Sequence, residues 1–203
     1  MSIEFQAAIA NLLQTVPFII PVIVALLGYW ITKRNQLELT RRGERLDLIN
    51  SRLNTFYGPL YVLSEVGFMA YKTLIDKMGG EEVFRKELMD ESVLREWQIW
   101  VEDIFIPLNK ASEDVIIQNA HLIREEAFPE SLFLFVMHAS LYKAMVAKWK
   151  QGDYREYLPQ IDYPLELREY VAKSYRELKQ EQLQLIGRMK PKQMQQQNQP
   201  SKP

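Results

Sequence analysis

The chain has 203 residues, with 25 Lys or Arg against 26 Asp or Glu, so its formal net charge is −1. Such a balance does not favour a general nucleic-acid binder, which usually carries a strong positive charge, and no nucleic-acid partner is expected. No cysteine is present, which excludes disulfides, thiolate metal ligands and a cysteine nucleophile. The hydrophobic fraction of 47% is typical of a globular protein with room for one domain and an appendage.

A long apolar run lies near the N-terminus. From Val16 to Ile31 the sequence holds no charged residue, and Leu12 and Leu13 extend the run. A helix of about 20 residues spans roughly 30 Å, the thickness of the hydrocarbon core of a bilayer. We therefore predict a transmembrane helix over residues 12–32, after a short N-terminal segment of residues 1–11. A cleaved signal peptide is the main alternative, but it would need a positive segment before the run and a small-residue cleavage site after it, and neither is present. A buried core helix is the other alternative, although such helices rarely run sixteen residues without a polar face.

Aromatic and basic residues follow the apolar run and set its orientation. Tyr29 and Trp30 stand at its C-terminal edge, where aromatic rings favour the headgroup region. All nearby positive charges come after it, namely Lys33, Arg34, Arg41, Arg42, Arg45 and Arg52. Because positive charge is retained on the cytoplasmic side, we expect a single-pass protein of the inner (plasma) membrane. Its N-terminus would lie outside, and its C-terminal domain would be cytoplasmic.

Residues 33–190 show apolar residues at helical spacing, without an alternating strand pattern. Gly58 and Pro59 predict a helix break, and Gly79 and Gly80 predict the end of the next helix near residue 78. Further helices are expected after Ser92, taken as the capping residue, over residues 131–150 and over residues 164–189. The sequence thus predicts an all-α protein, with one transmembrane helix followed by a cytoplasmic bundle of four to five helices. No internal repeat of fixed period is visible, and the polar tail of residues 191–203 is expected to be disordered.

Four segments give the chain a resemblance to known sequences. These are RLDLINSRLNTFYGPLY, IPLNKASEDVIIQNAHLI, HASLYKAMVAKW and YPLELREYVAKSYRELKQEQLQLI. Together they resemble a group of uncharacterised, membrane-anchored bacterial proteins, and FYGPLY is the most distinctive part. The resemblance covers most of the region from Arg45 to Ile186. It implies a bacterial helical domain and transfers no functional residue.

Candidate catalytic chemistry is sparse. The chain contains no phosphate-binding glycine motif, no nucleophile elbow and no H-E-x-x-H sequence. His121, Glu125 and His138 are the weak candidates for a metal site, but the Glu-x-x-His motif of di-iron bundles does not occur. We expect His138 to be a buried, hydrogen-bonded core residue and His121 to lie at the surface. No catalytic residue and no cofactor are predicted.

Acidic residues are concentrated between Glu81 and Asp103, where eight acids stand against three bases. Paired carboxylates can perform acid–base chemistry, but a solvated helix face is the usual explanation for such a run. This segment could also pair with the basic last helix, which carries Arg168, Lys173 and Arg176.

These observations favour a membrane-tethered helical adaptor or scaffold module that binds another protein or itself and has no catalytic activity. The alternative is an oligomerising membrane effector or pore component, in which cytoplasmic domains control the assembly of the transmembrane helices. An enzyme with an unrecognised site is the third reading.

Overall fold

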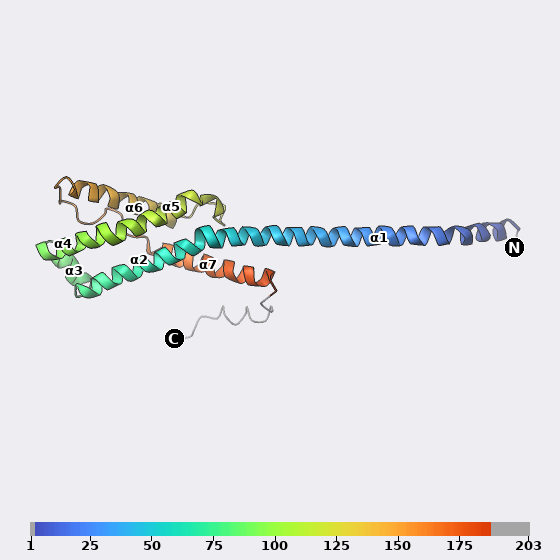
Figure 1. Ribbon diagram of the computed structural model, residues 1–203, viewed down its shortest axis with the longest axis horizontal. Coiled ribbons are helices and arrows are strands. Elements are labelled where there is room, and N and C mark those ends of the chain that lie inside the picture. The colour runs from blue at the N-terminus through green and yellow to red at the C-terminus, as the bar shows by residue number, and fades with distance from the viewer. Residues whose placement is uncertain (1–2, 188–203) are drawn as a thin grey trace. The chain divides into compact units, whose positions relative to one another are not determined.

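A computed structural model describes residues 3–187, with side chains from residue 21 onward. Every regular element in this part of the chain is a helix, which confirms the predicted all-α class (Figure 1). The chain divides into two compact units, one up to Asp47 and one from Leu48 onward. Each unit is described by itself.

The first unit consists of most of helix α1 (Ile3–Ser51). Every side chain from Pro21 to Arg45 is exposed, and Trp30 is 71% exposed. Among the residues whose side chains are described, no helix combines the length and the apolar character needed to cross a bilayer. Residues 12–20 of the predicted transmembrane helix lie outside the described side chains, as does the segment 1–11. The predicted disordered tail also lies outside the described residues.

The second unit begins with a π-helical turn, Arg52–Tyr57, that leads into α2 (Gly58–Lys77). The short α3 (Glu81–Glu87) follows, and α4 (Glu91–Trp100) then passes through a second π-helical turn, Val101–Phe105, into α5 (Ile106–Gln118). A 3₁₀ turn, Ala120–Leu122, precedes α6 (Glu130–Trp149) and α7 (Leu165–Leu185). If α4 and α5, which only the second π-helical turn separates, are counted together, the described part after α1 contains about five helices, in agreement with the four to five expected from the sequence.

Four of these helices form a closed arrangement. Helix α5 packs against α2 and α6, while α7 packs against α2 and α6 from the other side (Figure 1). Two apolar clusters fill the unit, one around Phe56, Tyr57 and Leu60, and the other around Trp97 and Met145. Tyr57 and Trp97 are almost fully buried and belong to the core.

Helix α4 begins differently from expectation. The prediction that Ser92 caps this helix was wrong, because Asp90 takes that position with an extended backbone. The Asp90 carboxylate accepts a hydrogen bond from the backbone N–H of Ser92 at 2.9 Å. The preceding helix α3 was not predicted, since seven residues give too short a periodic pattern to recognise.

The ion pairs of the acidic segment also differ from expectation. Glu81 pairs with Arg85, Glu91 with Arg95 and Glu96 with Lys77, all within or next to the segment. The proposed pairing with the basic last helix was therefore wrong. Two of these pairs join residues one helical turn apart, and the third joins Glu96 to Lys77 of α2. Arg168 of that helix instead pairs with Glu65 of α2.

Each of the two π-helical turns stands directly before a proline. The N–H of Gly58 bonds to the carbonyl of Leu53, and the N–H of Ile106 bonds to that of Val101, five residues back in both cases. Proline lacks an N–H and its ring collides with the carbonyl four residues earlier. The wider π turn removes this collision, so Pro59 and Pro107 begin new helices instead of breaking the chain.

The two prolines open the same short sequence, P-L-x-x-x-S-E, at residues 59–65 and 107–113. Ser64 and Ser112 are both buried, on the adjacent helices α2 and α5. Glu65 reaches Arg168 of α7, whereas Glu113 reaches Lys143 of α6. The bundle therefore contains two equivalent proline-initiated helices, each held by an ion pair to one outer helix. A search for fixed periods misses this pair because only four positions are shared.

The π-helical turn at Gly58 gives a testable prediction. A Cβ atom at Gly58 would collide with the carbonyl oxygen of Leu53, so Gly58→Ala should lower the free energy of unfolding by about 1–3 kcal/mol. Gly67, in the same helix, is the control, since a Cβ atom there would meet no atom within 4 Å. Gly67→Ala should raise stability by about 0.5–1 kcal/mol through helix propensity. Denaturant unfolding of the full chain, followed by circular dichroism, measures both, and equal effects would contradict this account.

Candidate functional site

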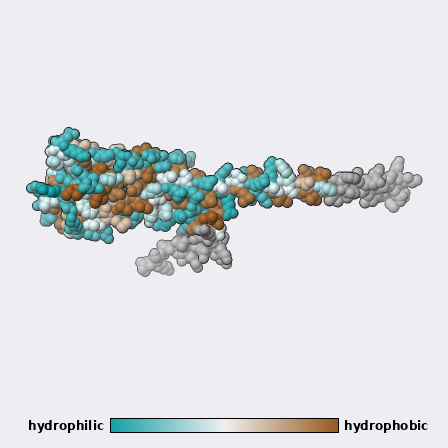
Figure 2. All heavy atoms as spheres, viewed as in Figure 1, coloured by the Kyte–Doolittle hydropathy of each residue, from teal (hydrophilic) through white to brown (hydrophobic). Residues whose placement is uncertain are grey.

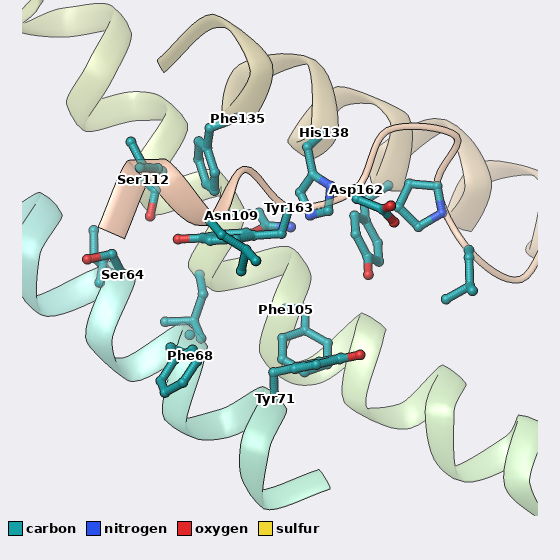
Figure 3. Close-up of a pocket in the computed structure, with 18 of the residues that line it drawn as sticks. Ser64, Phe68, Tyr71, Phe105, Asn109, Ser112, Phe135, His138, Asp162 and Tyr163 are labelled. Carbon is teal, nitrogen blue, oxygen red and sulfur yellow. The ribbon is translucent and has the colours of Figure 1, made fainter. Parts of the chain in front are cut away.

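A cavity of about 460 Å³ lies between α2, α5, α6 and the loop of residues 150–164 that joins α6 to α7 (Figure 3). Figure 3 shows Ser64 and Ser112 at one end of this pocket and His138 with Asp162 toward the other. The volume falls in the range that holds a small organic molecule. It is the candidate functional site of the described residues.

Three ring N–H groups hold the 150–164 loop against the bundle. Trp97 donates from Nε1 to the carbonyl of Tyr157 at 2.7 Å, and Trp149 donates to that of Glu156 at 2.8 Å. Nδ1 of His138 lies 2.7 Å from the carbonyl of Ile161. Because buried ring N–H groups need acceptors, these bonds satisfy the rings and position an irregular segment at the same time.

The pocket wall is mainly apolar and aromatic. Its aromatic members come from three helices and include Phe68 and Tyr71 of α2, Trp97 of α4 and Phe135 of α6. Phe105, from the second π-helical turn, stands 5.8 Å from Trp97 between ring centroids. Leu158 and Pro159 of the pinned loop close another side. Such a lining binds apolar and planar groups.

One charged group on the wall is fully engaged. The Glu81 carboxylate accepts a hydrogen bond from the Tyr71 hydroxyl at 2.8 Å and another from Arg85 Nε, also at 2.8 Å. These bonds neutralise Arg85 locally and fix Tyr71 as a donor. The remaining charged residue of the lining is Asp162, for which no described residue supplies a hydrogen bond or an ion pair.

His138 is held as a neutral ring of defined tautomer. A carbonyl oxygen only accepts, so Nδ1 carries the proton and donates it to Ile161. Burial lowers the pKa of His138, while the Ile161 hydrogen bond and the Asp162 charge oppose the effect. At neutral pH the ring is therefore uncharged, and Nε2 holds a free lone pair.

The tyrosines of the pocket remain protonated. Burial raises the pKa of Tyr142, and the nearby Tyr71 and Asp162 add to the shift. Burial also raises the pKa of Tyr71, and its hydrogen bond to Glu81 acts in the same direction. The pKa of Tyr163 rises to about 12, chiefly through burial. None of these tyrosine hydroxyls can act as a base near neutral pH, so in the pocket they serve as hydrogen-bonding groups.

The residues singled out for a metal site do not come together. His121 is exposed on the 3₁₀ turn after α5, whereas His138 lies in the pocket wall, buried as predicted. Glu125 accepts a hydrogen bond from the Tyr170 hydroxyl at 2.8 Å in a separate network with Tyr57. Among the described residues, no group of three or more histidine and carboxylate side chains is placed to hold a metal ion.

The residues expected to define membrane topology lie on α1 and are exposed, from Tyr29 and Trp30 to Arg41 and Arg42. Lys33 places its Nζ atom 5.8 Å from the ring centroid of Tyr29. Gly58 and Pro59, expected as a break, stand at the start of α2 after the π-helical turn.

Sequence reasoning missed the pocket itself. Its polar members come from distant segments, with Ser64 in α2, Asn109 and Ser112 in α5, and Asp162 in the 150–164 loop. None of them belongs to a recognisable motif. Only the repeated P-L-x-x-x-S-E sequence could have indicated two of the positions, since its serines line the pocket from both helices.

Comparison with known proteins gives no match, whether among protein-family models, curated proteins or solved structures. The resemblance of the FYGPLY region to membrane-anchored bacterial proteins therefore stays a prediction.

His138 gives a prediction for the pH dependence of stability. Its folded-state pKa lies below the ordinary value of 6.5. As the pH falls through that value, the unfolded chain binds a proton that the folded chain excludes, so the free energy of unfolding decreases until the folded pKa is reached. Denaturant titrations at about pH 7.5 and about pH 5.5 should show this loss.

His138→Asn should flatten the pH dependence, because the amide can donate to Ile161 in place of Nδ1 without titrating. His121, the other histidine of the sequence, is exposed and provides the control, so His121→Asn should leave the slope unchanged. A slope that follows His121 instead would contradict the assignment.

Proposed function

We propose that this protein is a membrane-tethered helical module without catalytic activity, which binds a protein partner at the cytoplasmic face of the inner (plasma) membrane. The predicted anchor is the segment 12–32, and the predicted interaction domain follows it. A tether of this kind raises the effective concentration of a module near its partner, a function that needs no active site.

The observation that carries the proposal is the exposure of an apolar helix. From Pro21 to Ile31, α1 presents large apolar side chains on all sides, and every one of them is exposed. Val22, Ile23 and Val24 are examples from different faces, since consecutive residues of an α-helix point about 100° apart. An uncovered apolar surface of this extent is unfavourable in water, so it supports insertion into lipid.

The sharp change in sequence after Ile31 supports the proposed orientation. Thr32 bonds its hydroxyl to the carbonyl of Gly28 at 2.8 Å, which keeps its polar group satisfied within the helix. Lys33 and Arg34 come next, and Arg34 pairs with Glu38 one turn later. Aromatic rings followed by positive charge are typical of the cytoplasmic edge of a spanning helix.

A stripe of apolar residues on α2 supports the protein-interaction role. Val62, Val66 and Met69 recur at steps of four and three residues and are exposed, Val62 by 59% and Met69 by 55%. Figure 2 shows brown, apolar residues interrupting the hydrophilic surface of this unit. An apolar stripe at this spacing is the surface that a partner helix or groove recognises.

The pore alternative depends on a polar face formed by Asn11, Gln14 and Thr15. These side chains lie outside the described residues, so no described feature favours a conducting assembly over a tether.

Charged substitutions in α1 test the anchor. Replacing Leu26 and Leu27 by arginine should abolish recovery of the full chain in carbonate-washed membranes, since each charge costs about 2.5–3.5 kcal/mol at the centre of a spanning helix. Leu37 and Leu39 are matched controls, exposed in the same helix but beyond the proposed anchor. Their replacement by arginine should leave the protein in the membrane. Equal behaviour of the two variants would refute the anchor.

Acidic substitutions in α2 test the interaction surface. After crosslinking in the native cell and detergent extraction, Val62→Glu with Met69→Glu should reduce the recovered stoichiometric partner by about tenfold or more, as expected for a central interface contact. Ile99→Glu, on the exposed side of α4, is the control and should have no effect. Recovery of the protein only with copies of itself would contradict the adaptor proposal and indicate that the surface mediates self-association.

A further inference from the structure

His138 offers the pocket a hydrogen-bond acceptor that the bundle leaves unused. His138 is only 5% exposed, and its Nδ1 proton is committed to Ile161. No described residue donates to Nε2. Among the described residues, every fully buried side-chain N or O atom has a hydrogen-bond partner, so Nε2, which has none, is not fully buried. It therefore opens onto the cavity that His138 lines. A ligand there must supply a hydrogen-bond donor, because a neutral Nε2 can only accept.

A second polar group opens onto the same space. Tyr142 stands one helical turn from His138 on α6, with ring centroids 4.8 Å apart, and is 7% exposed. Its hydroxyl has no partner among the described residues, so it also faces the cavity. The deep part of the pocket thus offers one acceptor and one hydroxyl between aromatic walls.

The uncompensated charge of the pocket is negative. Glu81 is saturated by Tyr71 and Arg85, whereas Asp162 has no ion-pair or hydrogen-bond partner among the described residues. Figure 3 shows Asp162 beside His138, and the Asp162 charge is close enough to act on the pKa of that ring. A carboxylate ligand would be repelled here, while an ammonium group would be attracted.

The walls favour the same kind of ligand. Tyr71, Trp97, Phe105 and Phe135 surround an apolar volume, and aromatic faces attract cations as well as apolar groups. The volume of about 460 Å³ exceeds what an ammonium ion needs and leaves room for an apolar body.

We propose that this pocket binds a small hydrophobic amine in its protonated form, with the ammonium group between His138 Nε2 and Asp162 and the apolar body against Phe105 and Phe135. The inference is independent of the membrane tether and of the α2 stripe, since it concerns other residues.

The test uses three ligands that share one body, namely phenylbutylamine, phenylbutanol and phenylbutyrate. Each is titrated calorimetrically at neutral pH into the full chain in nanodiscs of zwitterionic lipid, and the heat from empty nanodiscs is subtracted. The amine should bind saturably at one site, about two- to fivefold tighter than the alcohol, since an ion pair with an exposed carboxylate contributes about 0.2–1 kcal/mol. The acid should bind more weakly than both.

Two variants separate the roles of the charge and the acceptor. Asp162→Asn should weaken binding of the amine by about two- to fivefold and leave binding of the alcohol unchanged, because only the amine is charged. His138→Asn removes the Nε2 acceptor but keeps an N–H donor for the Ile161 carbonyl, so it should weaken the binding of both the amine and the alcohol. Glu126→Gln, an exposed carboxylate in the loop before α6, is the control and should change neither.

Three results would overturn the proposal. The first is an acid that binds as tightly as the amine. The second is an Asp162→Asn variant whose affinity for the amine is unchanged. The third is a heat of titration with the protein that equals the heat with empty nanodiscs at all amine concentrations up to millimolar. Because Asp162 is exposed, Asp162→Asn does not disturb the core, and its unchanged circular dichroism spectrum verifies this. The outcome remains decisive even if His138→Asn is poorly folded.

Discussion

Three ring N–H groups that donate to backbone carbonyls fix the one long irregular segment of the described bundle. Trp97, Trp149 and His138 are buried and must find acceptors, and the 150–164 loop supplies all three. A loop without regular hydrogen bonds would otherwise lie away from the helices. Its attachment closes the pocket, brings Asp162 next to His138 and decides the tautomer of that ring. The site therefore depends on the same bonds that satisfy the core aromatics.

The second constraint is the pair of prolines. Pro59 and Pro107 would each break a straight helix, and in each case a π-helical turn absorbs the missing hydrogen bond. In the two helices that follow these turns, α2 and α5, Ser64 and Ser112 line one pocket, while Glu65 and Glu113 reach the outer helices. The π-helical turn before a proline thus occurs twice, and the two helices that follow it form one end of the site.

The membrane-tether proposal and the amine-site proposal do not depend on each other. The anchor proposal rests on an apolar stretch of α1 that nothing in its own unit covers, and the amine site rests on an unused acceptor and an unpaired carboxylate. Burial keeps the pocket tyrosines protonated, so they remain available as hydrogen-bond donors.

The sequence alone determined the helical class, the helix ends at Gly79 and Gly80, and the burial of His138, because periodicity, glycine conformation and an apolar context are local properties. It also indicated an uncharged N-terminal helix followed by positive charge. Only the tertiary structure decided that Asp162 and His138 are neighbours, that Glu65 and not the acidic segment holds Arg168, and that His121 and Glu125 stand apart. Those pairings join positions far apart in the chain, where spacing carries no information and only packing brings side chains together.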